Sequence, residues 1–206
     1  MAKIKICGLT RPEDIEYANE FRPDYIGFVF HPQSRRYVTY EKAQKLKAAL
    51  KPDIQAAGVF VDEKPETVSR LCRNGIIDII QLHGNEDREY VTKLKTLTDK
   101  PVIKALRLGD FGSSDNELQN CRFYGADYLL LDSTAGSGKA FDWEHCQHCK
   151  NNFAKIFIAG GINASNAQRA IRVFSPYALD ISSGVETGEF KDREKIREII
   201  SLIRGI

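Results

Sequence analysis

The sequence predicts an α/β protein in which eight parallel strands close into a single-domain (β/α)8 barrel, also called a TIM barrel. Strand-like apolar runs alternate with charged segments of helical periodicity along the 206 residues. There are eight runs of each kind, which is the number that a closed barrel requires. An open doubly wound sheet is the alternative, but eight regular units leave no segment for edge strands, and no Gly-x-Gly-x-x-Gly follows the first strand. Because no linker or low-complexity segment interrupts the alternation, we expect residues 1–206 to form one domain.

The expected elements follow from hydrophobic periodicity and from residues suited to helix starts. The expected strands are 3–7, 25–30, 55–61, 77–83, 102–108, 128–132, 155–159 and 178–182. The expected helices are 12–21, 40–50, 65–74, 87–97, 114–123, 142–152, 164–173 and 193–203.

The first strand shows how the alternation places chemical groups. Two isoleucines share one face of this strand, and Lys5 and Cys7 share the other. Gly8 permits a turn after Cys7, and we expect the hydroxyl of Thr10 to cap the helix that follows. Cys7 is therefore a thiol at the carboxyl end of a strand, where barrels of this class build their active sites.

Composition favours a compact protein in the cytoplasm. With 42% hydrophobic residues and a net charge of +2, the chain can bury a full core and has no bulk attraction for nucleic acid. No apolar run approaches the ~20 residues of a membrane span, and the immediate first strand leaves no room for a signal peptide. Five cysteines in a chain of this size indicate reduced thiols.

Two loops carry an anion-binding pattern. Gly160 and Gly161 follow the seventh strand, and Ser182, Ser183 and Gly184 follow the eighth. Barrels commonly bind phosphate at this place through backbone amides, and serine hydroxyls add donors. Tight-turn glycines and capping serines are the alternative interpretation. Because both loops carry the pattern together, we expect a small phosphorylated ligand.

Three further rim positions suit catalysis or binding. Arg36 follows the second strand, and its guanidinium can hold a carboxylate through two hydrogen bonds; a solvated basic turn is equally consistent with Arg35 and Arg36. Asp132 ends an apolar strand, where desolvation would raise its pKa toward that of a general acid, unless it only caps a loop. Cys7 is either inert packing or a thiol that gains thiolate character from Lys5.

Six segments together resemble the phosphoribosylanthranilate isomerase family of tryptophan biosynthesis. Each motif is weak alone, but the set spans nearly the whole chain in the family's order. The segments are 5–10 (KICGLT), 34–37 (SRRY), 81–84 (QLHG), 130–133 (LLDS) with 136–143 (GSGKAFDW), 159–161 (AGG) and 180–186 (DISSGVE).

The resemblance implies an Amadori rearrangement without a cofactor or a metal. The family converts N-(5-phosphoribosyl)anthranilate to 1-(2-carboxyphenylamino)-1-deoxyribulose 5-phosphate. By position, Asp132 is the acid that protonates the ring oxygen, Cys7 the base that removes the C2 proton, and Arg36 the ligand of the anthranilate carboxylate. Gln81 and His83 match positions at the edge of the family's site. The residues that match its phosphate site are Gly160, Gly161, Asp180, Ser182, Ser183 and Gly184.

The class of barrel, metal binding, the shape of one loop and the oligomeric state each have alternative interpretations. Related phosphosugar isomerases or lyases, or a non-catalytic phosphometabolite-binding barrel, would keep the phosphate loops but not the pair of Cys7 and Asp132. His145, His148 and Cys149 share one side of a helix, which would allow adventitious metal binding, but no second ligand pair supports a structural zinc. Many family members have Pro-Gly before Lys-Asp in the loop at 186–192, so the shape of this loop is open, as is the choice between monomer and homodimer.

Overall fold

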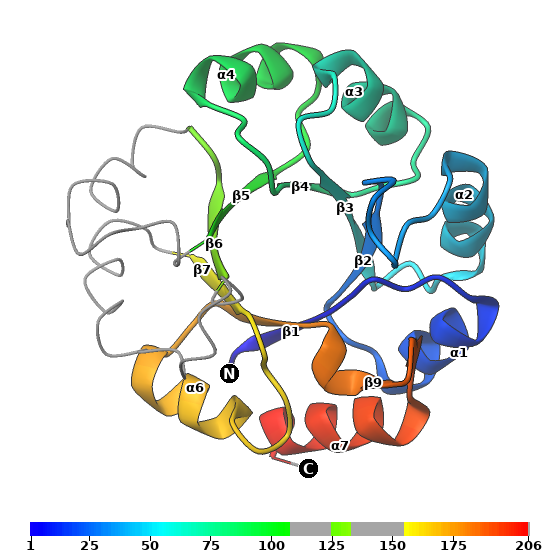
Figure 1. Cartoon of the computed structure of the whole chain (residues 1–206), viewed down its shortest axis with the longest axis vertical. Helices are drawn as coiled ribbons and strands as arrows, with labels where there is room; N and C mark the ends of the chain where they lie inside the picture. Colours follow the sequence, from blue (N-terminus) through cyan, green and yellow to red (C-terminus); the bar gives the residue numbers. More distant parts are fainter. Residues whose placement is uncertain (108–124, 133–154, 206) are drawn as a thin grey trace.

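The computed structural model describes residues 1–107, 125–132 and 155–205, and it contains the predicted closed barrel (Figure 1). All neighbouring strands are parallel and follow chain order, and the last strand pairs with the first. Every strand lies within two residues of its predicted bounds. The strands are β1 (Lys3–Cys7), β2 (Tyr25–Val29), β3 (Gln55–Phe60), β4 (Ile79–Leu82), β5 (Val102–Arg107), β6 (Tyr128–Asp132), β7 (Ile156–Ala159) and β8 (Ala178–Ile181).

The described helices surround the ring of strands (Figure 1). They are α1 (Pro12–Phe21), α2 (Tyr40–Ala49), α3 (Pro65–Arg73), α4 (Arg88–Leu97), α6 (Ala167–Phe174) and α7 (Arg193–Arg204). Helix α6 begins three residues later than predicted, because the side chains of Asn163 and Asn166 bind backbone amides and hold the preceding residues in a turn. The helices predicted at 114–123 and 142–152 lie outside the described residues.

The start of α1 differs from the prediction. Arg11 is the N-cap residue, and the carboxylate of Asp14 accepts hydrogen bonds from the backbone amides of Thr10 (2.8 Å) and Arg11 (2.9 Å). The expected cap by the hydroxyl of Thr10 is therefore wrong. A buried carboxylate in the first turn of the helix can accept hydrogen bonds from two free amides at once. Its negative charge also interacts favourably with the positive end of the helix dipole.

The core has two layers, which follow from the alternation of side chains along each strand. The outward residues of the strands, such as Ile4 and Ile6, pack against the helices. The inward residues fill the barrel, where the rings of Tyr25, Tyr128 and Phe157 pack edge to face near the amino-terminal end. The barrel interior is therefore a packed core.

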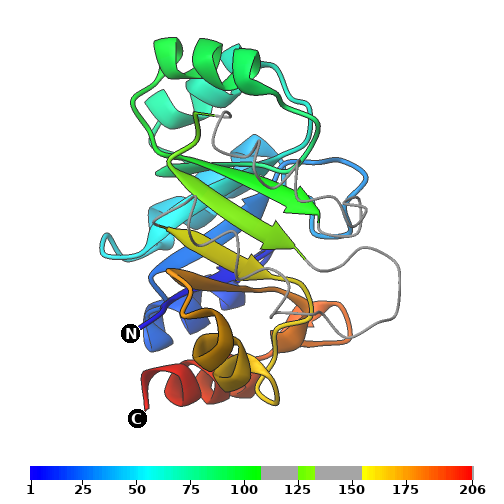
Figure 2. The same ribbon diagram turned by 90° about the vertical axis from the view of Figure 1, so that its left-hand side faces the viewer.

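The segment that follows β8 lies at the carboxyl-terminal end of the barrel, as the side view shows (Figure 2). After β8 the chain forms a short 3₁₀ turn (Ser183–Val185) and then a hairpin of β9 (Glu186–Thr187) and β10 (Phe190–Lys191). Gly188 begins the hairpin turn with a φ of 62°, a conformation that glycine adopts without steric cost. The loop whose shape the sequence left open is thus an ordered hairpin that places Lys191 in the interior.

Candidate active site

The carboxyl ends of the strands surround a cavity of about 300 Å³. Residues from the first strand to the last reach it, although they lie far apart in the sequence. Every predicted site residue except Gly184 lines the cavity, namely Cys7, Arg36, Gln81, His83, Asp132, Gly160, Gly161, Asp180, Ser182 and Ser183. The barrel therefore brings the predicted groups together at one rim.

Cys7 ends β1 and reaches this cavity although its side chain is mostly buried. Lys5, two residues earlier on the same face, donates hydrogen bonds to both oxygens of Asp180 at 2.9 Å. Burial raises the pKa of the Cys7 thiol, and the charge of Lys5 lowers that pKa by less than burial raises it. The effect of Lys5 that the sequence suggested is present, but the net shift opposes ionisation because the thiol is desolvated.

Asp132 ends β6 and faces the loop after β4. Its Oδ2 lies 3.4 Å from Nε2 of His83, and Nδ1 of His83 lies 3.2 Å from Nε2 of Gln81. When the amide of Gln81 donates to Nδ1, the ring proton is on Nε2 and points toward Asp132. The Oε1 of Gln81 is buried without a hydrogen-bond partner among the described residues, so it can accept a hydrogen bond from a bound ligand.

Arg36 is held by a carboxylate that sequence reasoning did not single out. Glu186, only 3% exposed, accepts hydrogen bonds from Nε (2.7 Å) and Nη2 (2.8 Å) of Arg36, from Arg35 (2.6 Å) and from Lys191 (2.6 Å). Burial opposes the ionisation of Glu186, but the hydrogen bonds from Arg36 and Lys191 outweigh it and lower its pKa to about 2. The guanidinium of Arg36 is thus fixed at the edge of the cavity.

The two glycine-containing loops touch each other. A Cβ atom on Gly184 would overlap the carbonyl oxygen of Ile162, so only glycine fits this contact. Gly161 has a φ of 65°, and a Cβ atom there would meet nothing within 4 Å, so the space above its backbone is open. The hydroxyl of Ser182 donates to the carbonyl oxygen of Cys7 at 3.0 Å. Residues of both loops line the cavity at the end of the barrel where phosphate sites occur in this fold.

A second buried ion pair holds the loop that carries His83. Lys104 Nζ donates to Oε2 of Glu86 (2.7 Å) and to the carbonyl oxygen of Gly84 (2.6 Å). Glu86 in turn accepts hydrogen bonds from the amides of Asp62 and Gly84 at 2.9 Å. Four charged residues near the rim, which are Glu86, Lys104, Glu186 and Lys191, were missed by sequence reasoning. Their partners lie on other elements, so the sequence does not show which of these charges form pairs.

The described residues contain neither a metal-binding cluster nor a membrane-spanning helix. Within the described parts of the chain, no group of three or more histidine, cysteine, aspartate or glutamate side chains could hold a metal ion. His145, His148 and Cys149 lie outside those parts. No helix among the described residues is both long and apolar enough to cross a membrane.

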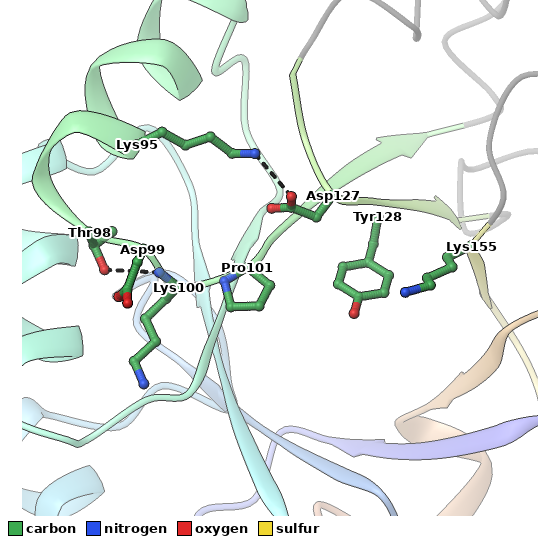
Figure 3. Close-up of a pocket in the computed structure, with 8 residues that line it drawn as sticks. All are labelled: Lys95, Thr98, Asp99, Lys100, Pro101, Asp127, Tyr128 and Lys155. Atoms are coloured by element: carbon green, nitrogen blue, oxygen red, sulfur yellow. Dashed lines mark hydrogen bonds and ion pairs between the residues drawn. The ribbon is translucent and has the colours of Figure 1, made fainter.

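A larger depression of about 480 Å³ lies at the opposite, amino-terminal end of the strands (Figure 3). Lys95 and Asp127 form an ion pair of 3.1 Å across one side of it, and Lys100, Tyr128 and Lys155 contribute to its walls. Both members of the pair are exposed, at 38% and 42%. None of the predicted site residues reaches this depression.

The fold and the rim cavity together define a (β/α)8-barrel enzyme in which a thiol, a carboxylate and two glycine-containing loops surround one small cavity. The family model described as N-(5'phosphoribosyl)anthranilate (PRA) isomerase matches residues 4–201. The chain belongs to this family.

Individual relatives match this chain over the full length of both proteins. The N-(5'-phosphoribosyl)anthranilate isomerase of Endomicrobium trichonymphae is 40% identical over 215 residues and is covered completely, as is this chain. The crystal structure of phosphoribosyl anthranilate isomerase from Thermotoga maritima has a TM-score of 0.89 at 34% identity, with both chains fully covered. A structure of the isomerase in complex with reduced 1-(o-carboxyphenylamino)-1-deoxyribulose 5-phosphate has a TM-score of 0.87 at 33% identity, again with both chains fully covered.

Proposed function

We propose that the protein isomerises N-(5-phosphoribosyl)anthranilate to 1-(2-carboxyphenylamino)-1-deoxyribulose 5-phosphate in tryptophan biosynthesis, with Asp132 as general acid and Cys7 as general base. Membership of the isomerase family supports the reaction. The observation that carries the assignment of roles is that Cys7 and Asp132 enter the same cavity from different strands, β1 and β6. A substrate anchored in that cavity meets both groups at once.

The reaction needs one proton donor and one proton acceptor. Asp132 gives its proton to the furanose ring oxygen while the lone pair of the anilino nitrogen forms a C1–N double bond and the bond from C1 to the ring oxygen breaks. Cys7, as thiolate, then removes the proton from C2, that electron pair forms the C1–C2 double bond of an enolamine, and the electrons of the C1–N double bond return to the nitrogen. The enolamine loses its hydroxyl proton and gains a proton at C1 to give the ketone. Each positioned group contributes about 10²–10⁴ to the rate.

The two ends of the substrate are held by the two sides of the cavity. Gly160, Gly161, Ser182, Ser183 and the adjoining Gly184 bind the phosphate through backbone amides and hydroxyls. Arg36 binds the anthranilate carboxylate with the N–H groups that Glu186 does not use. Such anchoring turns an encounter into a fixed geometry and supplies much of the remaining rate enhancement.

Gln81 and His83 take supporting roles. Gln81 contacts His83, and His83 contacts Asp132, so these two contacts orient the carboxyl group of Asp132. The Oε1 of Gln81 accepts a hydrogen bond from a ribose hydroxyl. No cofactor or metal takes part in the proposed mechanism. We place the protein in the cytoplasm as one domain over 1–206 that acts as a monomer or homodimer and binds no nucleic acid or membrane.

The test is turnover of freshly made phosphoribosylanthranilate, followed by loss of its anthranilate-type fluorescence. The expected result is rapid loss that reduced 1-(2-carboxyphenylamino)-1-deoxyribulose 5-phosphate inhibits competitively. Binding of this analogue without turnover would contradict the proposal and would support a non-catalytic phosphometabolite-binding barrel. Turnover of another phosphosugar in place of this substrate would instead support a related barrel isomerase or lyase.

A further inference from the structure

A charged lysine is buried together with its carboxylate partner next to Cys7, the proposed base. Lys5 is 0% exposed, and Asp180, which pairs with it from β8, is 7% exposed. Burying an ammonium ion costs several kcal/mol unless its partners are well placed. Both oxygens of Asp180 accept from Lys5 at 2.9 Å, and the two residues are directly opposite each other in the pairing of β1 with β8. Burial lowers the pKa of Lys5, but the charges and hydrogen-bonding groups of Asp180 and Cys7 together outweigh burial, so the pKa is raised and the ammonium stays charged.

The thiol of Cys7 and the ammonium of Lys5 converge on one small space. Gly27 on β2 lies opposite Cys7 in the strand register. A Cβ atom on Gly27 would lie 2.6 Å from Sγ of Cys7 and 3.2 Å from Nζ of Lys5. Glycine at this position therefore makes room for both groups, which lie against the same side of its backbone.

The hydrogen-bonding capacity of Lys5 leaves one donor for Cys7. An ammonium has three N–H donors, and Asp180 accepts two of them. Lys5 therefore has one N–H left to donate to Cys7, and its positive charge lowers the pKa of the thiol. A thiolate is the stronger acceptor, so this third bond strengthens when Cys7 ionises.

The other charged groups around Cys7 do not replace Lys5. Lys191 on β10 favours the thiolate, but it also donates to Glu186 at 2.6 Å, and Arg36 is paired with the same carboxylate. Asp180 opposes the thiolate through its negative charge. Lys5 is the largest favourable influence on ionisation of Cys7 among these groups.

We propose that Lys5 and Asp180 form a positioning pair for Cys7, in which Asp180 fixes the ammonium of Lys5 so that its third N–H stabilises the thiolate. The role in turnover rests on the proposed function, whereas the effect on the thiol itself does not. Asp180, assigned to the phosphate site by resemblance, then acts on the base instead. This role suits a carboxylate better, because a carboxylate repels a phosphate dianion.

Alkylation of Cys7 by iodoacetamide, measured against pH without substrate, tests the pair. The double variant Lys5→Met/Asp180→Asn removes both charges together and leaves no unpaired buried ion. Its alkylation midpoint should move upward by about one pH unit or more, and the rate near neutral pH should fall about 10-fold. The same measurement in a Cys7→Ala background subtracts the other four cysteines.

The single variant Asp180→Asn sharpens the test, because it should move the midpoint in the opposite direction. Without the competing carboxylate, the ammonium of Lys5 pairs with the thiolate and lowers the midpoint. The control is Lys104→Met/Glu86→Gln, which removes an equally buried ion pair from another part of the rim. Unchanged midpoints in both test variants would overturn the proposal. So would midpoints that move in the same direction in both test variants and in the control.

The kinetic arm links the pair to turnover. In the double variant, the acid limb of the kcat profile should shift to higher pH with KM within a few fold, as expected for a weaker base. A loss of kcat at every pH without such a shift would assign the pair a structural role only. If the wild type fails to turn over phosphoribosylanthranilate, the alkylation midpoints still decide whether Lys5 and Asp180 act on Cys7.

Discussion

The two ends of the barrel differ in how they hold charge. In the larger depression at the amino-terminal end, the ion pair between Lys95 and Asp127 is exposed to water. The smaller cavity at the carboxyl-terminal end is backed by ion pairs that are almost fully buried, such as Lys5 with Asp180. An exposed pair costs little to maintain, whereas a buried pair must overcome desolvation. Burial of charge therefore distinguishes the candidate active site better than the size of a cavity does.

The strongest test of this comparison is removal of the proposed acid or base. Cys7→Ala and Asp132→Asn should each lower kcat by at least ~10², with KM within a few fold, because proton transfer is lost in the transition state. Cys72→Ala, which truncates a buried cysteine on α3 away from the cavity, should leave kcat near that of the wild type. A catalytic variant with unchanged turnover would remove that residue from the mechanism.

The pH dependence of stability tests the buried carboxylate Glu186. Its pKa of about 2 lies below the ordinary value of 4.5, so its stabilising contribution is present above pH 4.5 and is lost as the pH falls toward 2. The shift corresponds to roughly 3 kcal/mol.

Urea unfolding between pH 5 and pH 2 measures this contribution. Wild type should lose more stability over this range than Glu186→Gln, which cannot titrate at this position. Asp53→Asn is the control, since it removes an exposed carboxylate that pairs with Arg22, and its slope should follow that of the wild type. Parallel slopes for wild type and Glu186→Gln would contradict the assigned pKa.

Arg36 and Arg35 provide a matched pair, because both contact Glu186 but only Arg36 lines the cavity. Arg36→Met should raise KM by about 10- to 100-fold with a smaller effect on kcat, as expected for loss of a charge-assisted hydrogen bond to a carboxylate. Arg35→Met removes the same charge at the edge and should change KM by no more than about twofold, because exposed pairs contribute little. Equal effects would show that the arginines act through Glu186 alone.

The smallest effect is expected at the amino-terminal depression. Lys95→Ala breaks the exposed pair with Asp127 and should lower the free energy of unfolding by less than about 1 kcal/mol. Its kcat/KM should equal that of the wild type. A large loss of activity would mean that the exposed end of the barrel contributes to the reaction, contrary to the comparison.

The sequence predicts the barrel and the rim well because both depend on local patterns. The alternation along β1 places Lys5 and Cys7 on the inner face and the isoleucines on the outer face, and the structure confirms this arrangement. Strand ends in a parallel barrel meet at one rim, so the residues at each strand end predict which side chains share the cavity. Of the predicted site residues, only Gly184 does not line the cavity, and it packs on Ile162 next to the lining residues.

Properties that depend on contacts between distant elements could not be predicted. Lys5 and Asp180 are 175 residues apart, and their pairing appears only when β8 closes on β1. Glu186 and Lys191 meet because a hairpin forms after β8, a shape that the sequence left open. The direction of the pKa shift of Cys7 depends on its burial, which a motif does not report.

The most direct test of the central claim compares wild type with Cys7→Ala on freshly made phosphoribosylanthranilate in the presence of a chelator. Loss of anthranilate-type fluorescence should be rapid with wild type and nearly absent with the variant, which would establish both the reaction and the base. Equal rates in the two proteins would contradict the role of Cys7. No loss with wild type, despite tight binding of the reduced product analogue, would contradict the proposed reaction itself.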